Sequence, residues 1–205
     1  MFLRILSALI IVSGLSLAGY SGWHLWQETH LVKTYDDKYS VSAKEEKQPL
    51  KPLDKGIHYK KKIKIGQSIG DLIIPRIKAR VPLIEGIGSN ELAKGVGHYP
   101  GKGMVFPGET GHAVLAGHRE TTFKKMKDIK KGDHLIIVND EGTFTYKVHK
   151  MWIVKANNRT VIVPKKKPIL TLITCYPFQM FGSSPQRYIV ESQLVKIEKP
   201  GEKKS

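Results

Sequence analysis

The chain has 205 residues, a length that supports one domain with a substantial core plus some additional chain. Its single cysteine excludes an intramolecular disulfide, and one cysteine with scattered histidines lacks the ligand spacing of a metal site. The formal charge of +16 at neutral pH predicts an anionic partner or surface.

The first 26 residues predict a membrane anchor. Ile5 to Trp26 contains no Lys, Arg, Asp or Glu, which is enough chain to cross a hydrocarbon core about 30 Å thick. Arg4 precedes this stretch and places the N-terminus in the cytoplasm, while Trp23 suits the far membrane interface. Cleavage of a signal peptide after residues 16–18 is the competing interpretation, but the apolar stretch continues beyond that point. We therefore expect a single-pass protein of the cell membrane, not a nucleic-acid-binding protein.

Residues 27–62 predict an extracytoplasmic stalk. Charges of both signs alternate there with Ser, Tyr and Pro, and no apolar periodicity persists. The expected organisation is an anchor at residues 1–26, the stalk at residues 27–62 and a folded domain at residues 63–205.

The folded domain is predicted to consist of short strands. Turn residues recur closely, and strands do not alternate regularly with helices. This pattern is typical of a small antiparallel barrel or sandwich with seven or eight strands. In chain order we expect strands at residues 69–75, 77–84, 113–116, 135–138, 143–154, 168–175 and 187–197, and short helices at residues 89–95 and 121–131.

The second strand of the predicted hairpin shows which of its sides should face the core. Phe144, Tyr146, Val148, Trp152 and Val154 all have the same parity. Since side chains alternate between the two faces of a strand, we expect these five to point inward.

The only cysteine, Cys175, ends a strand that is predicted to be buried. Residues 168–174 are largely apolar or β-branched, and Pro177 follows two residues after the thiol. Proline cannot donate to a β-ladder and disfavours helical angles in the residue before it, so the strand stops there. A thiol at the exit of a rigid strand is well placed for chemistry, but it needs a base or a cation nearby to react as a thiolate.

Among the eight histidines, three remain as candidate partners of the thiol: His98, His112 and His118. His118 follows an apolar strand, as Cys175 does, so two adjacent strands that end at one rim would bring them together. His112 lies at the other end of its strand. Arg187 opens the strand after the cysteine loop and therefore returns to the same rim, where its planar guanidinium suits a developing oxyanion.

Each of these residues also has an ordinary structural explanation. A cysteine at a strand end is commonly a small buried hydrophobe. Gly-His-Arg at residues 117–119 is commonly only a turn, and an arginine that opens a strand is commonly a surface charge. On position alone, the catalytic and the structural explanations are evenly balanced.

The local sequences around these residues resemble those of the sortase family. Residues 171–175 read TLITC, similar to the sortase signature TLxTC, and Arg187 follows 12 residues later. The tract LAGHR at residues 115–119 is similar to the sortase histidine segment. Pro-Gly-Glu at residues 107–109 and Tyr-Pro-Phe at residues 176–178 resemble class D most. The resemblance covers residues 66–198.

The resemblance implies an all-β fold: an eight-stranded closed barrel of the sortase type with one or two short helices, preceded by an N-terminal transmembrane helix. It also implies a cysteine transpeptidase on the outer face of a Gram-positive membrane. By this resemblance Cys175 is the nucleophile, His118 is the general acid that protonates the leaving amine, and Arg187 holds the substrate and stabilises the oxyanion. Ala116 and Thr174 match family positions that line the groove for the sorting signal.

The implied partners are surface proteins with an LPxTG-like sorting signal and an amine of a peptidoglycan precursor, which resolves the thioacyl enzyme. The class D resemblance favours LPxTA-like signals, and no cofactor is expected. Class A sortases bind calcium through acidic residues near the barrel. Here Glu85, Glu91, Glu109 and Asp140 are scattered along the chain, so no required metal is expected. Severalfold stimulation by millimolar calcium would contradict this.

Alternatives from other classes remain open. An L,D-transpeptidase is also β-rich with a catalytic cysteine, but its cysteine typically follows Ser-His-Gly, which Leu-Ile-Thr before Cys175 does not match. A papain-like hydrolase places its cysteine before its histidine, the opposite of the order here. A non-enzymatic basic barrel that binds anionic wall polymers is the third alternative, with Cys175 as core filler. Cleavage of a sorting-signal peptide and reactivity of the thiol separate these alternatives.

Overall fold

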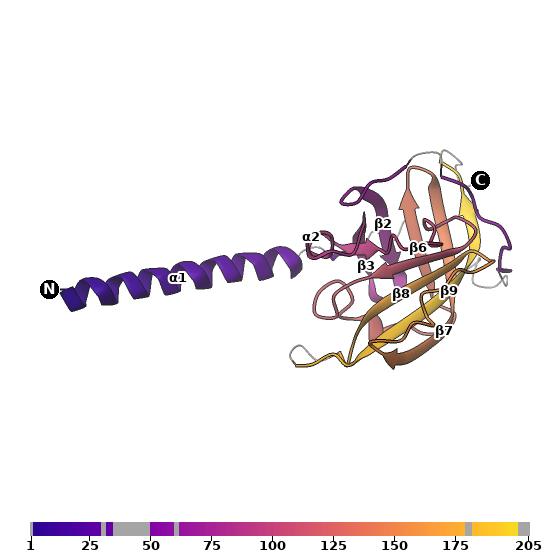
Figure 1. Ribbon diagram of the computed structural model, residues 1–205. Helices are drawn as coiled ribbons and strands as arrows, with labels where there is room; N and C mark the ends of the chain where they lie inside the picture. Colours follow the sequence, from indigo (N-terminus) through magenta and orange to yellow (C-terminus); the bar gives the residue numbers. More distant parts are fainter. Residues whose placement is uncertain (1, 30–31, 35–49, 60–61, 179–181, 201–205) are drawn as a thin grey trace.

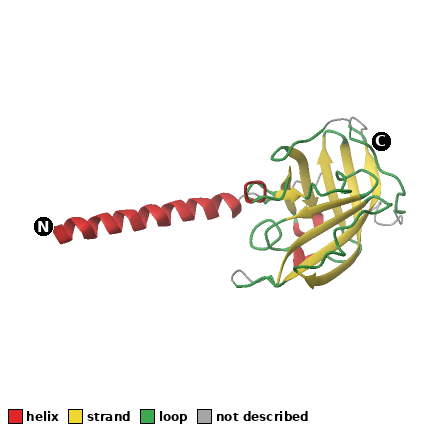
Figure 2. Cartoon of the chain, in the orientation of Figure 1, coloured by secondary structure: helices red, strands yellow, loops and turns green. Residues whose placement is uncertain are grey.

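The computed structural model describes residues 2–29, 32–34, 50–59, 62–178 and 182–200. A long helix, α1 (Phe2–Thr29), projects from one side of a β-barrel (Figures 1 and 2). Its segment Arg4–Trp23 is long and apolar enough to cross a membrane. Leu9, Leu15 and Leu17 each expose more than 60% of their surface, and the barrel covers none of this apolar segment. A helix that is apolar on all sides requires an apolar surrounding, which a bilayer provides.

Eight strands close into the barrel that was expected (Figure 2). Their order is β3-β2-β6-β7-β9-β8-β5-β4, and pairing of β4 with β3 closes the ring. Two neighbouring pairs, β3–β4 and β5–β8, are parallel, although an antiparallel sheet was predicted. The ring consists of β2 (Ser68–Ile74), β3 (Ala79–Glu85), β4 (Val96–His98), β5 (His112–Ala116), β6 (His134–Asn139), β7 (Gly142–Lys155), β8 (Ile169–Tyr176) and β9 (Gln186–Glu198).

The remaining described elements are short. A two-residue strand, β1 (Lys33–Thr34), pairs with the first part of β3, which β4 does not reach. The expected helix near residue 89 is the four-residue α2 (Ser89–Leu92). The helix expected across residues 121–131 is wrong: that segment forms turns and one 3-10 turn, η3 (Met126–Asp128). A second 3-10 turn, η2 (Pro75–Ile77), joins β2 to β3.

The barrel interior is apolar, and side chains of alternating parity along the strands fill it. Burial of this set removes enough apolar surface from water to hold the strand framework rigid. The segment after β5 contributes Phe123, Met126 and Ile129, which are buried although no α-helix carries them. The largest fully buried side chains from the strands are Leu72, Ile73, Ile74, Leu83, Leu115, Leu135, Ile137, Phe144, Tyr146 and Leu170.

A β-bulge in β7 changes which side chains face the core. Its register with β9 shifts between Val148 and Lys150. Phe144, Tyr146 and Val148, before the shift, are buried as expected. After the extra residue the parity is reversed, so the predicted inward positions of Trp152 and Val154 are wrong. Trp152 instead lies opposite Ile189 on the outer side of the barrel.

Part of the expected stalk packs on the barrel. In the described segment 50–59, the Leu53 amide donates to the Leu194 carbonyl at 2.8 Å, and Tyr59 is only 8% exposed. Glu109 accepts hydrogen bonds from the Tyr59 amide and from the Phe106 amide, both at 3.0 Å. This segment, which we call the arm, is therefore attached to the barrel. The other residues expected in the stalk lie largely outside the described residues, and the three domain limits stay a prediction.

Candidate active site

The β8–β9 pair places Arg187 directly across from Cys175. These two residues are register partners in an antiparallel ladder. Partners in such a ladder lie on the same face, with Cβ atoms about 4.5–5.5 Å apart. Leu172 belongs to the interior, so Cys175, three positions later, belongs to the outer face. The thiol and the guanidinium therefore share one patch on the outside of the barrel.

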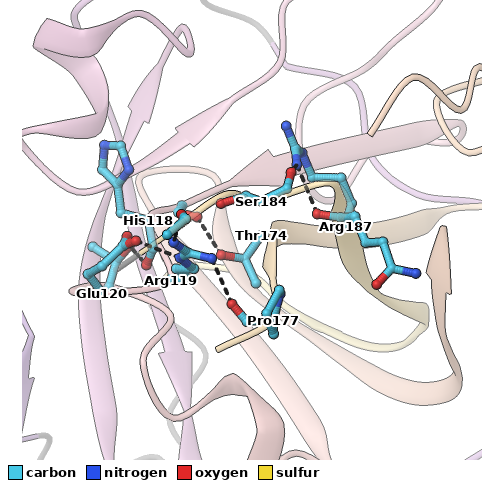
Figure 3. Close-up of polar contacts among 11 residues, drawn as sticks. His118, Arg119, Glu120, Thr174, Pro177, Ser184 and Arg187 are labelled. Atoms are coloured by element: carbon cyan, nitrogen blue, oxygen red, sulfur yellow. Dashed lines mark hydrogen bonds and ion pairs between the residues drawn. The ribbon is translucent and has the colours of Figure 1, made fainter. Parts of the chain in front are cut away.

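The parallel β5–β8 pair brings the histidine segment to the same rim. Ala116 is the register partner of Ile173, and the Gly117 amide donates to the Ile173 carbonyl at 3.2 Å. Continuing this register by two residues sets the main chain of His118 against that of Cys175. Three adjacent strands thus deliver the histidine, the cysteine and the arginine to one end of the barrel. Figure 3 shows His118 and Arg187 on either side of Thr174, the residue before the cysteine.

The surroundings of these residues leave them open to a substrate. His118 is exposed, and Cys175 and Arg187 are half-buried. The Nη1 atom of Arg187 donates to the carbonyls of Ser184 and Gln186, at 2.9 and 2.8 Å (Figure 3). These bonds fix the plane of the guanidinium, while Nε and Nη2 have no partner among the described residues. Two donors with a fixed orientation are what an oxyanion requires.

The two other candidate histidines are occupied. His98 contacts Glu85 Oε2 through Nδ1 at 2.5 Å and the Val105 carbonyl through Nε2 at 2.9 Å, and it is 3% exposed. The fully buried His112 contacts the Val163 carbonyl and Thr171 Oγ1, at 2.6 and 2.8 Å. Burial lowers the pKa of His112, with a further lowering from Lys165, so the neutral ring is favoured. Both rings therefore have structural roles.

Thr174 and Ala116, the predicted groove residues, lie on opposite sides of the sheet. Thr174 is 2% exposed, and its hydroxyl donates to the Gly117 carbonyl at 2.8 Å (Figure 3). That bond ties β8 to the residue before His118. Ala116 faces outward in a row of register partners across four strands: Ala116, Ile173, Ile189 and Trp152. This apolar row is adjacent to the Cys175–Arg187 pair. Contact of either residue with substrate stays a prediction.

Arg119 is a functional candidate that sequence reasoning missed. It is 6% exposed, and its guanidinium donates to Glu120 Oε1 at 2.6 Å, to the Pro177 carbonyl at 2.8 Å and to the Gly182 carbonyl at 3.0 Å (Figure 3). It therefore connects the histidine segment to two points of the connection between β8 and β9, its first residue and Gly182. The only signal for Arg119 in the sequence is its position next to His118. The two main-chain carbonyls that it binds belong to residues about 60 positions further along the chain.

Two of the four acidic residues considered as calcium ligands are engaged elsewhere. Glu85 contacts His98, and Glu109 binds the arm and the Phe106 amide. Within the described ranges, no three His, Cys, Asp or Glu side chains gather closely enough to hold a metal ion.

Comparisons with known proteins agree with the motifs. A family described as Sortase domain matches residues 72–195. Sortase D of Bacillus subtilis is 34% identical over 197 residues, which cover 94% of this chain and 98% of that protein. The structure of the catalytic domain of B. anthracis SrtD matches with a TM-score of 0.59 and 38% identity, over 70% of this chain and 97% of that one. Sortase C from Clostridium perfringens SM101 matches with a TM-score of 0.57 and 29% identity, over 65% of this chain and 73% of that one.

Proposed function

The chain belongs to the sortase family, and we propose that it acts as a membrane-anchored sortase of class D with Cys175 as its nucleophile. Its substrates are surface proteins with an LPxTG-like sorting signal, with LPxTA-like signals favoured by the class. It cleaves the signal through a thioacyl intermediate and transfers the protein to an amine of a peptidoglycan precursor. The observation that carries this proposal is the strand register that sets Cys175 between Arg187 and the segment of His118.

In the first step His118 takes up the proton of the Cys175 thiol, and the resulting thiolate attacks the carbonyl carbon of the signal's threonine. Negative charge develops on the carbonyl oxygen, and the two unengaged donor atoms of Arg187 stabilise it. The C–N bond then breaks, and the leaving amine takes a proton from His118. The product is a thioester between Cys175 and the threonine, and the C-terminal piece of the substrate is released.

In the second step an amine attacks the thioester carbonyl. His118 accepts the proton that the attacking amine loses, the Cys175 thiolate leaves, and His118 returns this proton to the thiolate. Arg187 again stabilises the tetrahedral oxyanion. The outward apolar row beginning at Ala116 provides a surface for the leucine and proline of the signal. Thr174 acts from the inner side by fixing Gly117, and hence the position of His118.

The proposed location is the cell membrane, with one span formed by α1, the N-terminus in the cytoplasm and the barrel extracytoplasmic. The apolar segment Arg4–Trp23 and its exposed surface support the span. Membership of the sortase family favours the function of a sortase over that of an L,D-transpeptidase and over that of a wall-binding barrel without activity.

The test is cleavage of fluorogenic LPxTG and LPxTA peptides by the full chain in detergent, with and without an acceptor amine. The full chain is needed because the arm packs on the barrel. We expect cleavage that is accelerated by the amine and lost in Cys175→Ala, and rapid modification of the folded protein by a methanethiosulfonate reagent. Activity that survives in Cys175→Ala would reject the mechanism, and an inert thiol would favour the wall-binding alternative.

A further inference from the structure

The end of the barrel that carries the candidate active site is also the end joined to α1. Val32 packs against the barrel core, and β1 pairs Lys33 with Arg80. The helix ends at Thr29, three residues before Val32. Because an extended chain spans at most about 3.6 Å per residue, Val32 lies within roughly 11 Å of the helix end. A bilayer around α1 would therefore come close to this end of the barrel.

A cavity of about 390 Å³ opens at this end. Its apolar lining is Val32, Ile77 and Ala79, which are buried or half-buried. Its cationic lining is Lys78, Lys124 and Lys125, which are exposed. We call these three lysines the basic rim. Glu120, Thr121 and Thr122 complete the lining.

The basic rim has no acidic counterpart. None of its three lysines forms an ion pair within the described part of the chain. The neighbouring carboxylates are largely neutralised, because Glu120 pairs with Arg119 and Asp133 pairs with Arg76, each at 2.6 Å. The surface beside the anchor is therefore strongly positive and includes a partly apolar recess.

We propose that this cavity and the basic rim bind the phosphate head groups of anionic phospholipids. Three lysines beside a bilayer each strengthen binding to an anionic leaflet by roughly fivefold. The attraction decays over about 8 Å at physiological ionic strength. The apolar span ends at Trp23, so the six further helical residues and the connection to Val32 keep the rim within about 20 Å of the bilayer surface. The apolar lining suits the first carbons of a lipid's acyl chains. An anionic wall polymer would meet the same charges but would gain nothing from this position beside the anchor.

Docking of this kind would hold the catalytic rim against the membrane surface. The segment that lines the cavity begins two residues after His118. The barrel would then not turn freely about its connection to α1, and the peptide groove would have a fixed height above the bilayer. This inference rests on the proposed membrane anchoring by α1, but it does not depend on the catalytic assignments.

The test uses the full chain with Cys175→Ala and one new cysteine, Lys127→Cys, which carries a fluorescent donor. The protein is reconstituted in nanodiscs of phosphatidylcholine alone or with about one third phosphatidylglycerol, and an acceptor dye labels the lipid head groups. We expect at least twofold higher energy transfer in the anionic discs, and its loss in high salt. The triple variant Lys78→Glu, Lys124→Glu and Lys125→Glu should show the low transfer of the neutral discs.

The control is the triple variant Lys55→Glu, Lys102→Glu and Lys166→Glu. Lys55 lies in the arm, Lys102 in the loop before β5 and Lys166 in the loop before β8, and all three are exposed at the other end of the barrel. The control changes the net charge by the same amount as the test variant. Energy transfer should remain high. Equal transfer in both kinds of disc, or equal loss in both triple variants, would overturn the proposal. Failure of the chain to enter discs would instead reject membrane anchoring by α1, and the docking proposal would be rejected with it. The labelled protein carries Cys175→Ala, so the energy-transfer result does not depend on catalysis. Failure of the wild-type chain to cleave a peptide would therefore count against the proposed function and not against the docking.

Discussion

Arg187 shares the outer face of the β8–β9 pair with Cys175. Two main-chain carbonyls bind its Nη1 atom and fix the plane of the guanidinium, and Nε and Nη2 are the donors left for a substrate. A lysine could supply the charge there, but its ammonium is a flexible point charge without a fork. We therefore expect Arg187→Lys to lower kcat/KM for a sorting-signal peptide by about a hundredfold or more, since one oxyanion donor is worth that much. Steady-state cleavage measures this.

The matched control for this change is Arg159→Lys, at an exposed arginine in the loop after β7. It should leave kcat/KM within twofold. Near-normal turnover in Arg187→Lys would remove the guanidinium from the mechanism and leave the thiol to act with His118 alone.

Arg119 acts through its neighbours rather than on the substrate. Its bonds to the Pro177 and Gly182 carbonyls fix two points of the connection between β8 and β9, which we expect to form one side of the groove. Lysine can reach at most one of these carbonyls. We expect Arg119→Lys to raise KM for the peptide severalfold with a smaller change in kcat, since Cys175 stays on its strand.

Two measurements separate this positioning role from a loss of fold. The rate of methanethiosulfonate reaction with the folded variant should match the wild type, because exposure of Cys175 does not depend on Arg119. If KM is unchanged while the melting temperature falls, Arg119 only stabilises the fold and does not shape the groove.

At the scale of elements, the parallel pairing of β5 with β8 decides whether the site exists. His118 follows the C-terminal end of β5 and Cys175 lies in the last two residues of β8, and such ends meet only in a parallel pair. The sequence located the strand ends by proline, glycine and apolar runs, and the strands at residues 69–75 and 187–197 agree closely with β2 and β9. Strand order and direction leave no local signal in the sequence, so the strand-end positions suggested the meeting of the two ends but left it evenly balanced, and the family resemblance decided it.

Two other features could not be predicted for related physical reasons. The bulge in β7 adds one residue to the strand, and no change in the pattern of residue types marks it. The sequence therefore could not show that Trp152 points outward. The arm holds Leu53, Ile57 and Tyr59 at no regular spacing, and its partners lie about 50 residues or more away. Contacts of this kind depend on tertiary structure, which periodicity does not describe.

The arm also yields a prediction about stability. Each carboxylate oxygen of Glu109 accepts one main-chain N–H, from Tyr59 and from Phe106. Glutamine offers one acceptor and would turn a donor toward the second N–H. Glu109→Gln should therefore lower the free energy of unfolding by about 1–3 kcal/mol. It should also speed proteolysis within residues 50–59, which urea titration and limited digestion measure. The control Asp54→Asn breaks an exposed ion pair with Lys167 and should change stability by less than about 0.5 kcal/mol.

For the whole molecule, charge is distributed so that acid should weaken the fold. Burial and Lys165 hold the pKa of His112 below its ordinary value of 6.5. Burial raises the pKa of Asp133, but the hydrogen bonds and charge of Arg76 outweigh this and lower it. The pKa of Glu191 is lowered in the same way, by His149 and Lys165 against the effect of burial. All three groups bind protons more weakly in the folded state than in the unfolded state.

The sign follows from proton linkage. Where the unfolded state binds more protons, the free energy of unfolding rises with pH. His112 is therefore fully stabilising above about pH 6.5 and loses this contribution as the pH falls below that value. The two carboxylates add a second loss in the range below their ordinary pKa values, near 4. Thermal unfolding followed from pH 8 to pH 4 should show a plateau, a decline that begins near pH 6.5, and a steeper decline near pH 4.

The variant His112→Gln assigns the first decline. Glutamine does not titrate, so the melting temperature of the variant should be lower at pH 8 but flat between pH 7 and pH 5. His58→Gln should keep the wild-type profile, because the His58 side chain is 94% exposed and solvent weakens its contact with Glu109 Oε1 at 3.1 Å. A decline of equal size in His112→Gln would show that the general accumulation of positive charge, starting from +16, governs acid stability instead of this one buried ring.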